Sequence, residues 1–260
     1  MHDTRVAAIL VAAGLGKRLG AAEPKQFAEL GGRALLTHAL RTLSTSVHVV
    51  HVVVVLPVGW EERARTLCAA AGLDLVHTTW IAGGATRQES VHRGLQALPD
   101  ATHVLVHDAA RPFLTATHIE RTVHAARQHD AATLALPVTD TLLRAAPEHD
   151  GAAQATQHVE RRGMWAIQTP QVFERTLLEQ AHERARADHA QATDDGTLVL
   201  ALGRTVVLVE GNWWNLKITT PDDFERARWI LDSGFTTRRD THAGVTAPPR
   251  TRGTREGGRR

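Results

Sequence analysis

The chain has 260 residues, enough for one large domain, and 43% of them are apolar, which is ample for a core. No apolar run reaches membrane-spanning length, no signal layout opens the chain, and the single cysteine, Cys68, excludes an intramolecular disulfide, so we expect a cytoplasmic protein with no membrane partner. The formal net charge is +2, but seven arginines lie from Arg238 onward against only Asp240 and Glu256. The remainder is therefore slightly acidic, which excludes a basic nucleic-acid-binding surface in the folded part.

Strands and helices alternate along the first half of the chain. Continuous apolar runs predict strands that are buried on both faces, and apolar residues at helical spacing predict the helices between them. In chain order the predicted elements are a strand at 6–13, a helix at 33–43, a strand at 48–57, a helix at 61–71 that buries Cys68, a weaker strand at 73–81, a helix at 86–98, a strand at 103–107, a helix at 115–128 and a strand at 131–137. This order predicts an α/β fold with a Rossmann-like, doubly wound, mostly parallel sheet, whose ligands bind beyond the carboxyl ends of the strands.

The second half contains a polar insertion. Residues 138–162 lose the apolar runs and carry turn signals at Pro147 and Asp150-Gly151, which predicts a protruding β-arm formed by a hairpin. An isolated hairpin is marginally stable in water, so we expect the arm to pack on a second subunit of a homodimer. The predicted elements that follow are a strand at 165–169, helices at 174–187 and 193–202, a strand at 205–209 and a helix at 221–231. We expect one domain over residues 1–235 and a disordered, solubilising basic tail over 236–260.

A loop of small residues follows the first strand. Gly14, Gly16 and Gly20 let the backbone approach a ligand closely, and the loop region carries three cations, Lys17, Arg18 and Lys25. Backbone N–H groups and cations beside the end of a parallel strand suit a polyphosphate. The spacing matches neither a Walker loop nor the dinucleotide-binding pattern, and by itself it also fits a plain strand-to-helix turn. With the segment 24–27 (Pro-Lys-Gln-Phe) attached, we favour nucleotide binding.

Two further segments carry candidate chemistry. Gly83-Gly84 precede a helix, where backbone groups and Ser90 are placed to contact a base; the alternative is a helix N-terminus with Thr86 as N-cap and Glu89 completing a capping box. Asp108 ends an apolar strand, and its carboxylate suits Mg²⁺, although a lone aspartate there also fits a cap or turn. The histidines of the chain are scattered without the spacing typical of metal ligands, so we expect no zinc site.

Five motifs together resemble one enzyme family. They are A-A-G-x-G-x-R-x-G with P-K-Q-F, then G-G-x-x-R-x-x-S-V, D-A-A-R-P, T-P-Q-x-F and N-x-K-I-T-x-P-x-D. In this combination, over roughly residues 6–232, the chain resembles the 2-C-methyl-D-erythritol 4-phosphate cytidylyltransferases of the non-mevalonate isoprenoid pathway. The resemblance implies the fold of the nucleotidyltransferases and nucleotide-diphospho-sugar transferases, CTP and 2-C-methyl-D-erythritol 4-phosphate as substrates, Mg²⁺ or another divalent cation as cofactor, and a dimer formed through the arm.

The resemblance also assigns roles to residues. The catalytic residues it implies are Arg18, Lys25, Arg161 and Lys217. The nucleotide-binding residues it implies are Ala12, Ala13, Gly14, Gly16, Gly84, Ala85 and Ser90. The substrate-binding residues it implies are Arg111, Thr141, Arg161, Thr169, Thr193 and Lys217, with Asp108 as the metal ligand. Position 85 is usually acidic in the family and is alanine here, Arg162 is an adjacent alternative to Arg161, and Thr193 also fits a plain helix N-cap. Trp213-Trp214 has no explanation in the sequence.

The expected chemistry needs no general base, because the attacking phosphate oxygen is already anionic. Catalysis is then mostly positioning and electrostatic stabilisation. Two other functions remain open from the sequence. One is a cytidylyltransferase for another polyol phosphate, such as ribitol 5-phosphate, and the other is a non-catalytic nucleotide-binding protein.

Overall fold

A seven-stranded sheet forms the centre of the protein. The computed structural model describes residues 4–14, 23–146 and 152–234. From one edge to the other the strands are β11 (Val207–Glu210), β7 (Ala131–Pro137), β10 (Trp165–Glu174), β6 (His103–Asp108), β1 (Val6–Val11), β4 (Val49–Leu56) and β5 (Thr78–Ala82). Strand β10 runs antiparallel to its neighbours β6 and β7, and the other neighbouring pairs of the described sheet are parallel. The predicted α/β fold with a mostly parallel sheet is confirmed.

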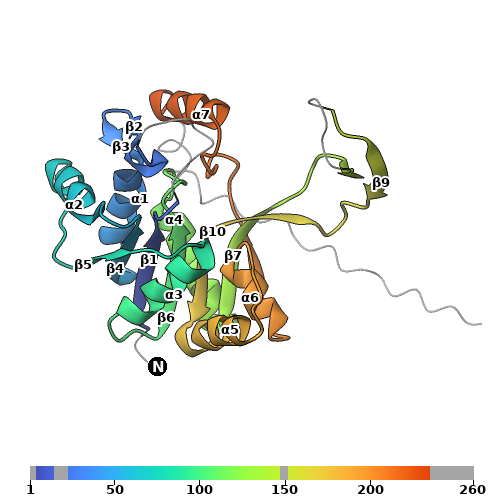
Figure 1. The fold of residues 1–260 in the computed structure, drawn as a ribbon, viewed down its shortest axis with the longest axis horizontal. Helices are drawn as coiled ribbons and strands as arrows, with labels where there is room; N and C mark the ends of the chain where they lie inside the picture. The colour runs from blue at the N-terminus through green and yellow to red at the C-terminus, as the bar shows by residue number, and fades with distance from the viewer. Residues whose placement is uncertain (1–3, 15–22, 147–151, 235–260) are drawn as a thin grey trace, which may run out of the picture.

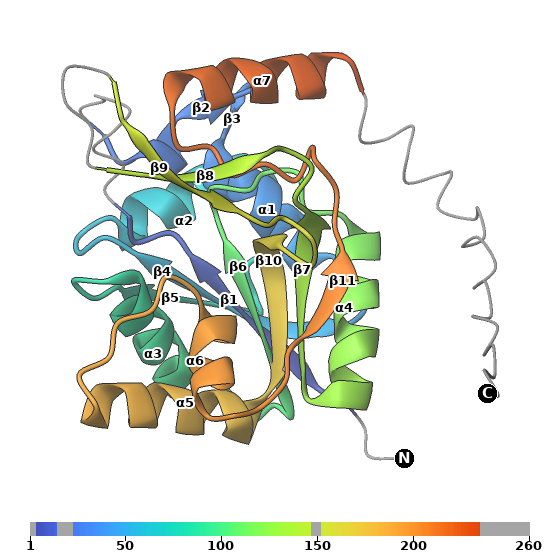
Figure 2. The ribbon, with the colours of Figure 1, turned by 90° about the vertical axis from the view of Figure 1, so that its right-hand side faces the viewer.

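Helices cover both faces of the sheet (Figure 1). One face packs against α1 (Leu35–Ser44), α2 (Glu61–Ala70) and α4 (Ala116–His129), and the other against α3 (Arg87–Ala97), α5 (Arg175–Ala187) and α6 (Asp195–Ala201). Figure 2 shows the sheet between α4 on one side and α5 and α6 on the other. Because both faces are covered, the central strand is fully buried from Val6 to Leu10, which explains its unbroken apolar sequence. Cys68 is buried as predicted, and burial raises the pKa of its thiol to about 12.

A smaller layer lies at the carboxyl end of the strands. It contains a short 3-10 helix η2 (Lys25–Phe27), the hairpin β2 (Glu29–Leu30) and β3 (Arg33–Ala34), and α7 (Pro221–Asp232), which crosses the top of the molecule in Figure 1. Helix α7 begins with a capping box between Thr220 and Asp223, and proline at its first position suits a helix start. Trp214 and Ile218 join this layer in a small apolar cluster. The layer holds two of the predicted motifs over the edge of the sheet where parallel strands end.

The polar insertion forms the predicted arm. Strands β8 (Leu142–Ala145) and β9 (Ala155–Val159) pair antiparallel and project away from the body (Figure 1). The predicted turn at 147 and 150–151 and the predicted basic tail from 236 to 260 lie outside the described residues. Strand β10 starts at the base of this arm with exposed Trp165 and ends in the core with fully buried Phe173, so one strand links the arm to the body.

Some predicted boundaries move by a few residues. Residues Arg33 and Ala34 pair as strand β3 before α1 begins, and strand β10 continues to Glu174. Helix α6 begins at Asp195 with Asp194 as its N-cap, whose carboxylate accepts from the N–H of Thr197 at 2.8 Å. The alternative that made Thr193 the N-cap is therefore wrong, because the carboxylate one residue later takes that position. Within the described ranges, no helix is both long enough and apolar enough to cross a lipid bilayer.

Candidate active site

A cavity of about 740 Å³ opens at the carboxyl edge of the sheet. Its wall is built from the segments that follow β1, β4, β5 and β6, together with η2 and the loop before α7. The predicted site residues that line it are Ala12, Ala13, Gly14, Lys25, Gly84, Ala85, Ser90, Asp108 and Lys217. Residues from opposite ends of the sequence therefore share one cavity, at the edge of the sheet where ligands of doubly wound folds bind.

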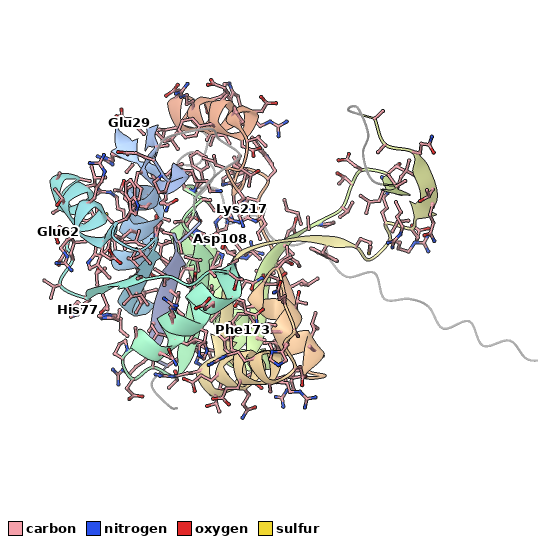
Figure 3. The ribbon with its side chains drawn as sticks, in the orientation of Figure 1. Glu29, Glu62, His77, Asp108, Phe173 and Lys217 are labelled. Atoms are coloured by element: carbon pink, nitrogen blue, oxygen red, sulfur yellow. The ribbon has the colours of Figure 1, made fainter. Side chains whose placement is uncertain are left out.

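Asp108 lies at the base of this cavity, at the last position of β6. Its side chain is 9% exposed and pairs with two cations, with Lys217 Nζ at 2.6 Å from Oδ2 and Arg87 Nε at 3.1 Å from Oδ1. Figure 3 shows Asp108 and Lys217 beside each other near the base of the arm. Burial alone would raise the pKa of Asp108, but attraction to Arg87 and Lys217 outweighs it and holds the pKa well below its ordinary value. The carboxylate is thus ionised at neutral pH, the form in which it can bind a cation.

Arg87 is a site residue that was not among the predicted ones. It is the first residue of α3, and its second contact is with Asp195, whose Oδ2 lies 2.8 Å from Arg87 Nη1. Asp195 is 1% exposed and also contacts His182 Nε2 at 3.0 Å. The sequence does contain a feature that could have identified Arg87 as a site residue, because it is the only cation of the motif G-G-x-x-R-x-x-S-V. Its pairing with Asp195 was not visible, because 108 positions separate the two residues.

Lys25 joins two distant motifs. Its Nζ donates to the carbonyl of Ile218 at 2.8 Å, which fixes the Pro-Lys-Gln-Phe segment against the loop that carries Lys217. The neighbouring Gln26 is buried, and its Nε2 donates to the carbonyl of Ala12 at the end of the first strand. Trp60 closes the wall nearby, with its ring 4.7 Å from that of Phe27. The three segments are thus held together by contacts within the chain.

The second glycine segment is tightly packed. A Cβ on Gly83 would lie 2.4 Å from that of Ala13, so only glycine allows this approach between two cavity walls. The N–H of Gly84 donates to Ser90 Oγ at 3.1 Å, and the N–H of Ala85 donates to Glu89 Oε2 at 2.8 Å. Thr86 caps α3 as predicted, but Glu89 accepts from Ala85 rather than from the N-cap residue, so the expected capping box is wrong in that detail. The base contacts assigned to this segment stay predictions.

Arg111 and Thr169 lie behind the cavity rather than in its lining. Arg111 is buried, its Nη1 donates to the carbonyl of Asn215 at 2.7 Å, and burial lowers its pKa. The hydroxyl of Thr169 accepts from the N–H of Asp108 at 3.1 Å and lies 2.9 Å from His107 Nδ1. Burial also lowers the pKa of His107 to about 4, so this histidine is neutral at pH 7 and is satisfied within the chain, with Nε2 3.1 Å from the carbonyl of Arg111. These contacts brace the end of β6, and the substrate-binding roles of Arg111 and Thr169 stay predictions.

The remaining predicted residues lie elsewhere. Thr141 and Arg161 are exposed on the arm, where Arg161 donates to the carbonyl of Thr139, and Arg161 and Arg162 line a separate hollow of about 600 Å³ at the arm's base. Thr193 is exposed before α6 and does not line the main cavity. Gly16 and Arg18 lie outside the described residues.

The tryptophan pair is partly explained. Trp214 packs into the apolar cluster below α7, while Trp213 is 51% exposed and meets the Trp214 ring edge-on at 5.9 Å. Trp214 is therefore a packing residue of this cluster, and Trp213 lies against it at the surface.

Comparisons with known proteins point to one family. A family profile described as "IspD: 2-C-methyl-D-erythritol 4-phosphate cytidylyltransferase" matches residues 6–233. The 2-C-methyl-D-erythritol 4-phosphate cytidylyltransferase of Deinococcus radiodurans is 44% identical over 236 residues, which is 90% of this chain and 94% of that protein. The bifunctional enzyme IspD/IspF of Anaeromyxobacter sp. (strain Fw109-5) is 48% identical over 233 residues, and the alignment covers 90% of this chain but only 59% of that longer protein.

A solved structure agrees with these relatives. The crystal structure of 2-C-methyl-D-erythritol 4-phosphate cytidylyltransferase from Thermus thermophilus matches with a TM-score of 0.70 and 38% identity, over 86% of this chain and 98% of that one. The family profile covers every described strand and helix from β1 to α7, so the match includes the body that carries the cavity. This chain belongs to the IspD family, the 2-C-methyl-D-erythritol 4-phosphate cytidylyltransferases, as its five motifs predicted.

Proposed function

We propose that this chain transfers CMP from CTP to 2-C-methyl-D-erythritol 4-phosphate and releases pyrophosphate, a step of non-mevalonate isoprenoid biosynthesis. The observation that carries the proposal is the meeting of Lys25, Asp108 and Lys217 in one cavity of a chain from this family. A cavity of about 740 Å³ with a mostly apolar wall and a few charged groups is of the size and kind that holds a nucleotide.

The reaction transfers one nucleotidyl group. A phosphate oxygen of the acceptor attacks the α-phosphorus of CTP, the new P–O bond forms, and the bond to the pyrophosphate leaving group breaks. The attacking oxygen is already an anion, so no side chain has to remove a proton. The difficulty is to hold anions together and to stabilise the extra negative charge at phosphorus. Lys25, with Arg18 of the first glycine loop, supplies positive charge to the triphosphate, and Lys217, with Arg161, orients the acceptor phosphate.

Mg²⁺ fits the donor set at Asp108. Among the described residues no group of three or more His, Cys, Asp or Glu side chains is arranged to hold a metal, and Asp108 is the one carboxylate among the described residues that line the cavity. Mg²⁺ binds in this way in nucleotide enzymes, through one or two carboxylates while phosphate oxygens and waters supply the rest. Asp108 would hold the ion, which would neutralise part of the triphosphate charge.

A homodimer formed through the arm completes the proposal. Two arm-borne residues assigned to the acceptor, Thr141 and Arg161, lie away from the cavity of their own chain. The arm and its base also expose large apolar side chains, namely Leu143, Met164, Trp165 and Ile167. Such a surface on a two-stranded hairpin is typical of an interface. Arg161 then serves the site of the second subunit.

Pyrophosphate release tests the activity directly. The full chain is mixed with CTP, Mg²⁺ and 2-C-methyl-D-erythritol 4-phosphate, and parallel reactions contain ATP, GTP or UTP. We expect pyrophosphate with CTP well above the other nucleotides. Release with ribitol 5-phosphate in preference to the methylerythritol substrate would move the assignment to another polyol phosphate. No release with any polyol phosphate, despite CTP binding, would favour a non-catalytic nucleotide-binding protein.

A further inference from the structure

A series of contacting polar side chains runs from the cavity into the interior. Lys217 contacts Asp108, Asp108 contacts Arg87, Arg87 contacts Asp195, and Asp195 contacts His182 of α5, at 2.6, 3.1, 2.8 and 3.0 Å in that order. The proposed mechanism uses only the two members at the cavity end. The inner members come from α3, α5 and α6, which pack on one face of the sheet.

The buried position of the Asp195 carboxylate is unfavourable unless its charge is paired. Its side chain is 1% exposed, and a buried carboxylate loses its hydration, which a partner has to offset. The residue does not cap α6, because Asp194 does so through the N–H of Thr197. Both Asp195 oxygens are instead committed, Oδ2 to Arg87 and Oδ1 to His182. The contacts of Asp195 therefore serve to hold Arg87.

Arg87 in turn holds Asp108. The guanidinium is planar, and it presents Nε to Asp108 and Nη1 to Asp195, so fixing one nitrogen against the interior fixes the direction of the other. Asp108 Oδ1 is thereby tied to an anchored group, while Oδ2 faces the more exposed ammonium of Lys217. Arg87 lines the cavity beside Asp108, so its position also shapes the cavity wall.

The pairing of Arg87 with Asp195 also affects the charge that acts on Asp108. Asp108 is surrounded by Arg87, Lys217 and Arg111, an excess of positive charge that opposes a divalent cation. Asp195 shares the charge of Arg87 and so reduces the part of it that acts on Asp108. Without the Asp195 carboxylate, the full charge of Arg87 would act on the carboxylate that has to accept the metal.

We infer that Arg87 is a positioning residue, anchored by Asp195, that fixes the carboxylate of Asp108 and preserves its affinity for a divalent cation. The inference rests on the proposed function, since it concerns the metal that accompanies CTP. Groups that orient a metal ligand through one further contact typically change metal affinity or activity by about 10- to 100-fold when they are removed.

The test compares two aspartate-to-asparagine variants. Asp195→Asn removes the buried charge and keeps the shape, and Asp188→Asn is the matched control, because Asp188 pairs with Arg184 at the exposed end of α5. Mn²⁺ binding in the presence of CTP, without acceptor, is followed by the electron paramagnetic resonance signal of free Mn²⁺. The Mg²⁺ concentration that gives half-maximal pyrophosphate release is measured in parallel. We expect Asp195→Asn to weaken both by about 10-fold and Asp188→Asn to change neither.

Arg87→Lys provides a second variant that keeps the positive charge. A lysine ammonium reaches one of the two carboxylates but cannot bridge both, so we expect the same loss of Mn²⁺ affinity with little change in the KM for the acceptor. This variant decides the outcome if Asp195→Asn does not fold. Mn²⁺ affinity equal to wild type in folded Asp195→Asn or in Arg87→Lys would overturn the inference. A wild-type chain that neither binds Mn²⁺ with CTP nor releases pyrophosphate would instead overturn the proposed function.

Discussion

Lysine is rare in this chain, and its positions are informative. Of the 30 basic residues other than histidine only three are lysines, Lys17, Lys25 and Lys217, and all three fall in the motif segments. Everywhere else the chain uses arginine. An ammonium is a compact point charge on a flexible stem, whereas a guanidinium is a rigid planar fork. The motif segments thus place flexible ammonium groups where a side chain can turn from a contact within the chain to a ligand. Arginines such as Arg87 lie where a fixed geometry holds other groups in place.

Lys25→Ala tests the role of one of these ammonium groups. The chain should fold, because Lys25 is a cavity-lining side chain outside the apolar core, although its contact with the carbonyl of Ile218 is lost; kcat/KM for pyrophosphate release should fall on the order of 100-fold. Steady-state kinetics and the melting temperature measure the two effects separately. Arg33→Ala, at an exposed position of the neighbouring hairpin, is the control and should leave the rate unchanged. Wild-type turnover in Lys25→Ala would remove this residue from the mechanism.

A buried histidine makes the stability depend on pH. His118 caps α4 by accepting from the N–H of Thr115, and burial lowers its pKa from 6.5 to about 4. Because the folded-state pKa is below the unfolded one, the unfolded chain binds the proton more readily between these values. The stability that this group contributes is full above about pH 6.5 and is lost as the pH falls toward 4, up to about 3 kcal/mol.

His118→Gln should reduce that dependence. Glutamine also completes a capping box at this position, so the helix start is kept while the titration is removed. Urea unfolding at several values between about pH 7 and pH 4.5 should show a smaller loss of unfolding free energy than in the wild-type chain. His124→Gln, exposed on the same helix, should show the wild-type pH dependence. An identical slope in both variants would mean that other groups dominate the acid response.

At the scale of the elements, the approach of α3 to the central strand depends on one glycine. A Cβ on Gly94 would lie 2.7 Å from Cγ2 of Ile9, in the fully buried part of β1. Alanine would normally favour a helix by about 1 kcal/mol over glycine, but here the added methyl group has no room. The close approach sets the distance of α3, and with it Arg87, from the sheet.

Gly94→Ala should therefore destabilise the protein by about 1–3 kcal/mol despite its better helix propensity. Urea unfolding measures the change, and combination with Ile9→Ala should give a loss smaller than the sum of the two single losses, because the second substitution removes the clashing methyl group. Strictly additive losses would show that the contact between this helix and β1 is not what the glycine protects.

Most elements could be predicted from local pattern, and the exceptions have physical causes. The apolar runs at β1 and β4 predict strands that agree with the observed ones within one or two residues, since long stretches of buried apolar residues leave little ambiguity. Strand β10 was predicted too short because its register with β7 shifts between Ile167 and Gln171, which breaks the pattern. The motifs predicted the cavity lining, but the Arg87–Asp195 pair depends on how α3 and α6 pack, and no local pattern encodes that.

At the scale of the whole molecule, the arm predicts complementation between subunits. If Arg161 acts in the partner's site, a heterodimer of Lys25→Ala and Arg161→Ala chains contains one intact site, because the first chain lends its arm to the second. Random mixing makes about half of the dimers heterodimers, so roughly a quarter of wild-type activity should return. Pyrophosphate release is measured after the two inactive variants are unfolded and refolded together.

Each variant refolded alone is the control and should stay inactive. Recovery on mixing would support the arm as a shared element between subunits. No recovery, with heterodimers shown by a tag on one variant, would place Arg161 in the site of its own chain or outside the reaction.

Strand β10 connects the arm, through which we propose that subunits assemble, to the site around Asp108. It leaves the arm at Trp165, is buried from Gln168 to Phe173, and carries the Thr169 hydroxyl that accepts from the backbone N–H of Asp108. Because neighbouring residues of a strand point to opposite faces, inserting or deleting one residue at its start would either slide the arm or turn Thr169 away from Asp108. An insertion in the distal hairpin of β8 and β9 would leave this register unchanged, so we expect variation in arm length among relatives to fall in the hairpin rather than within β10.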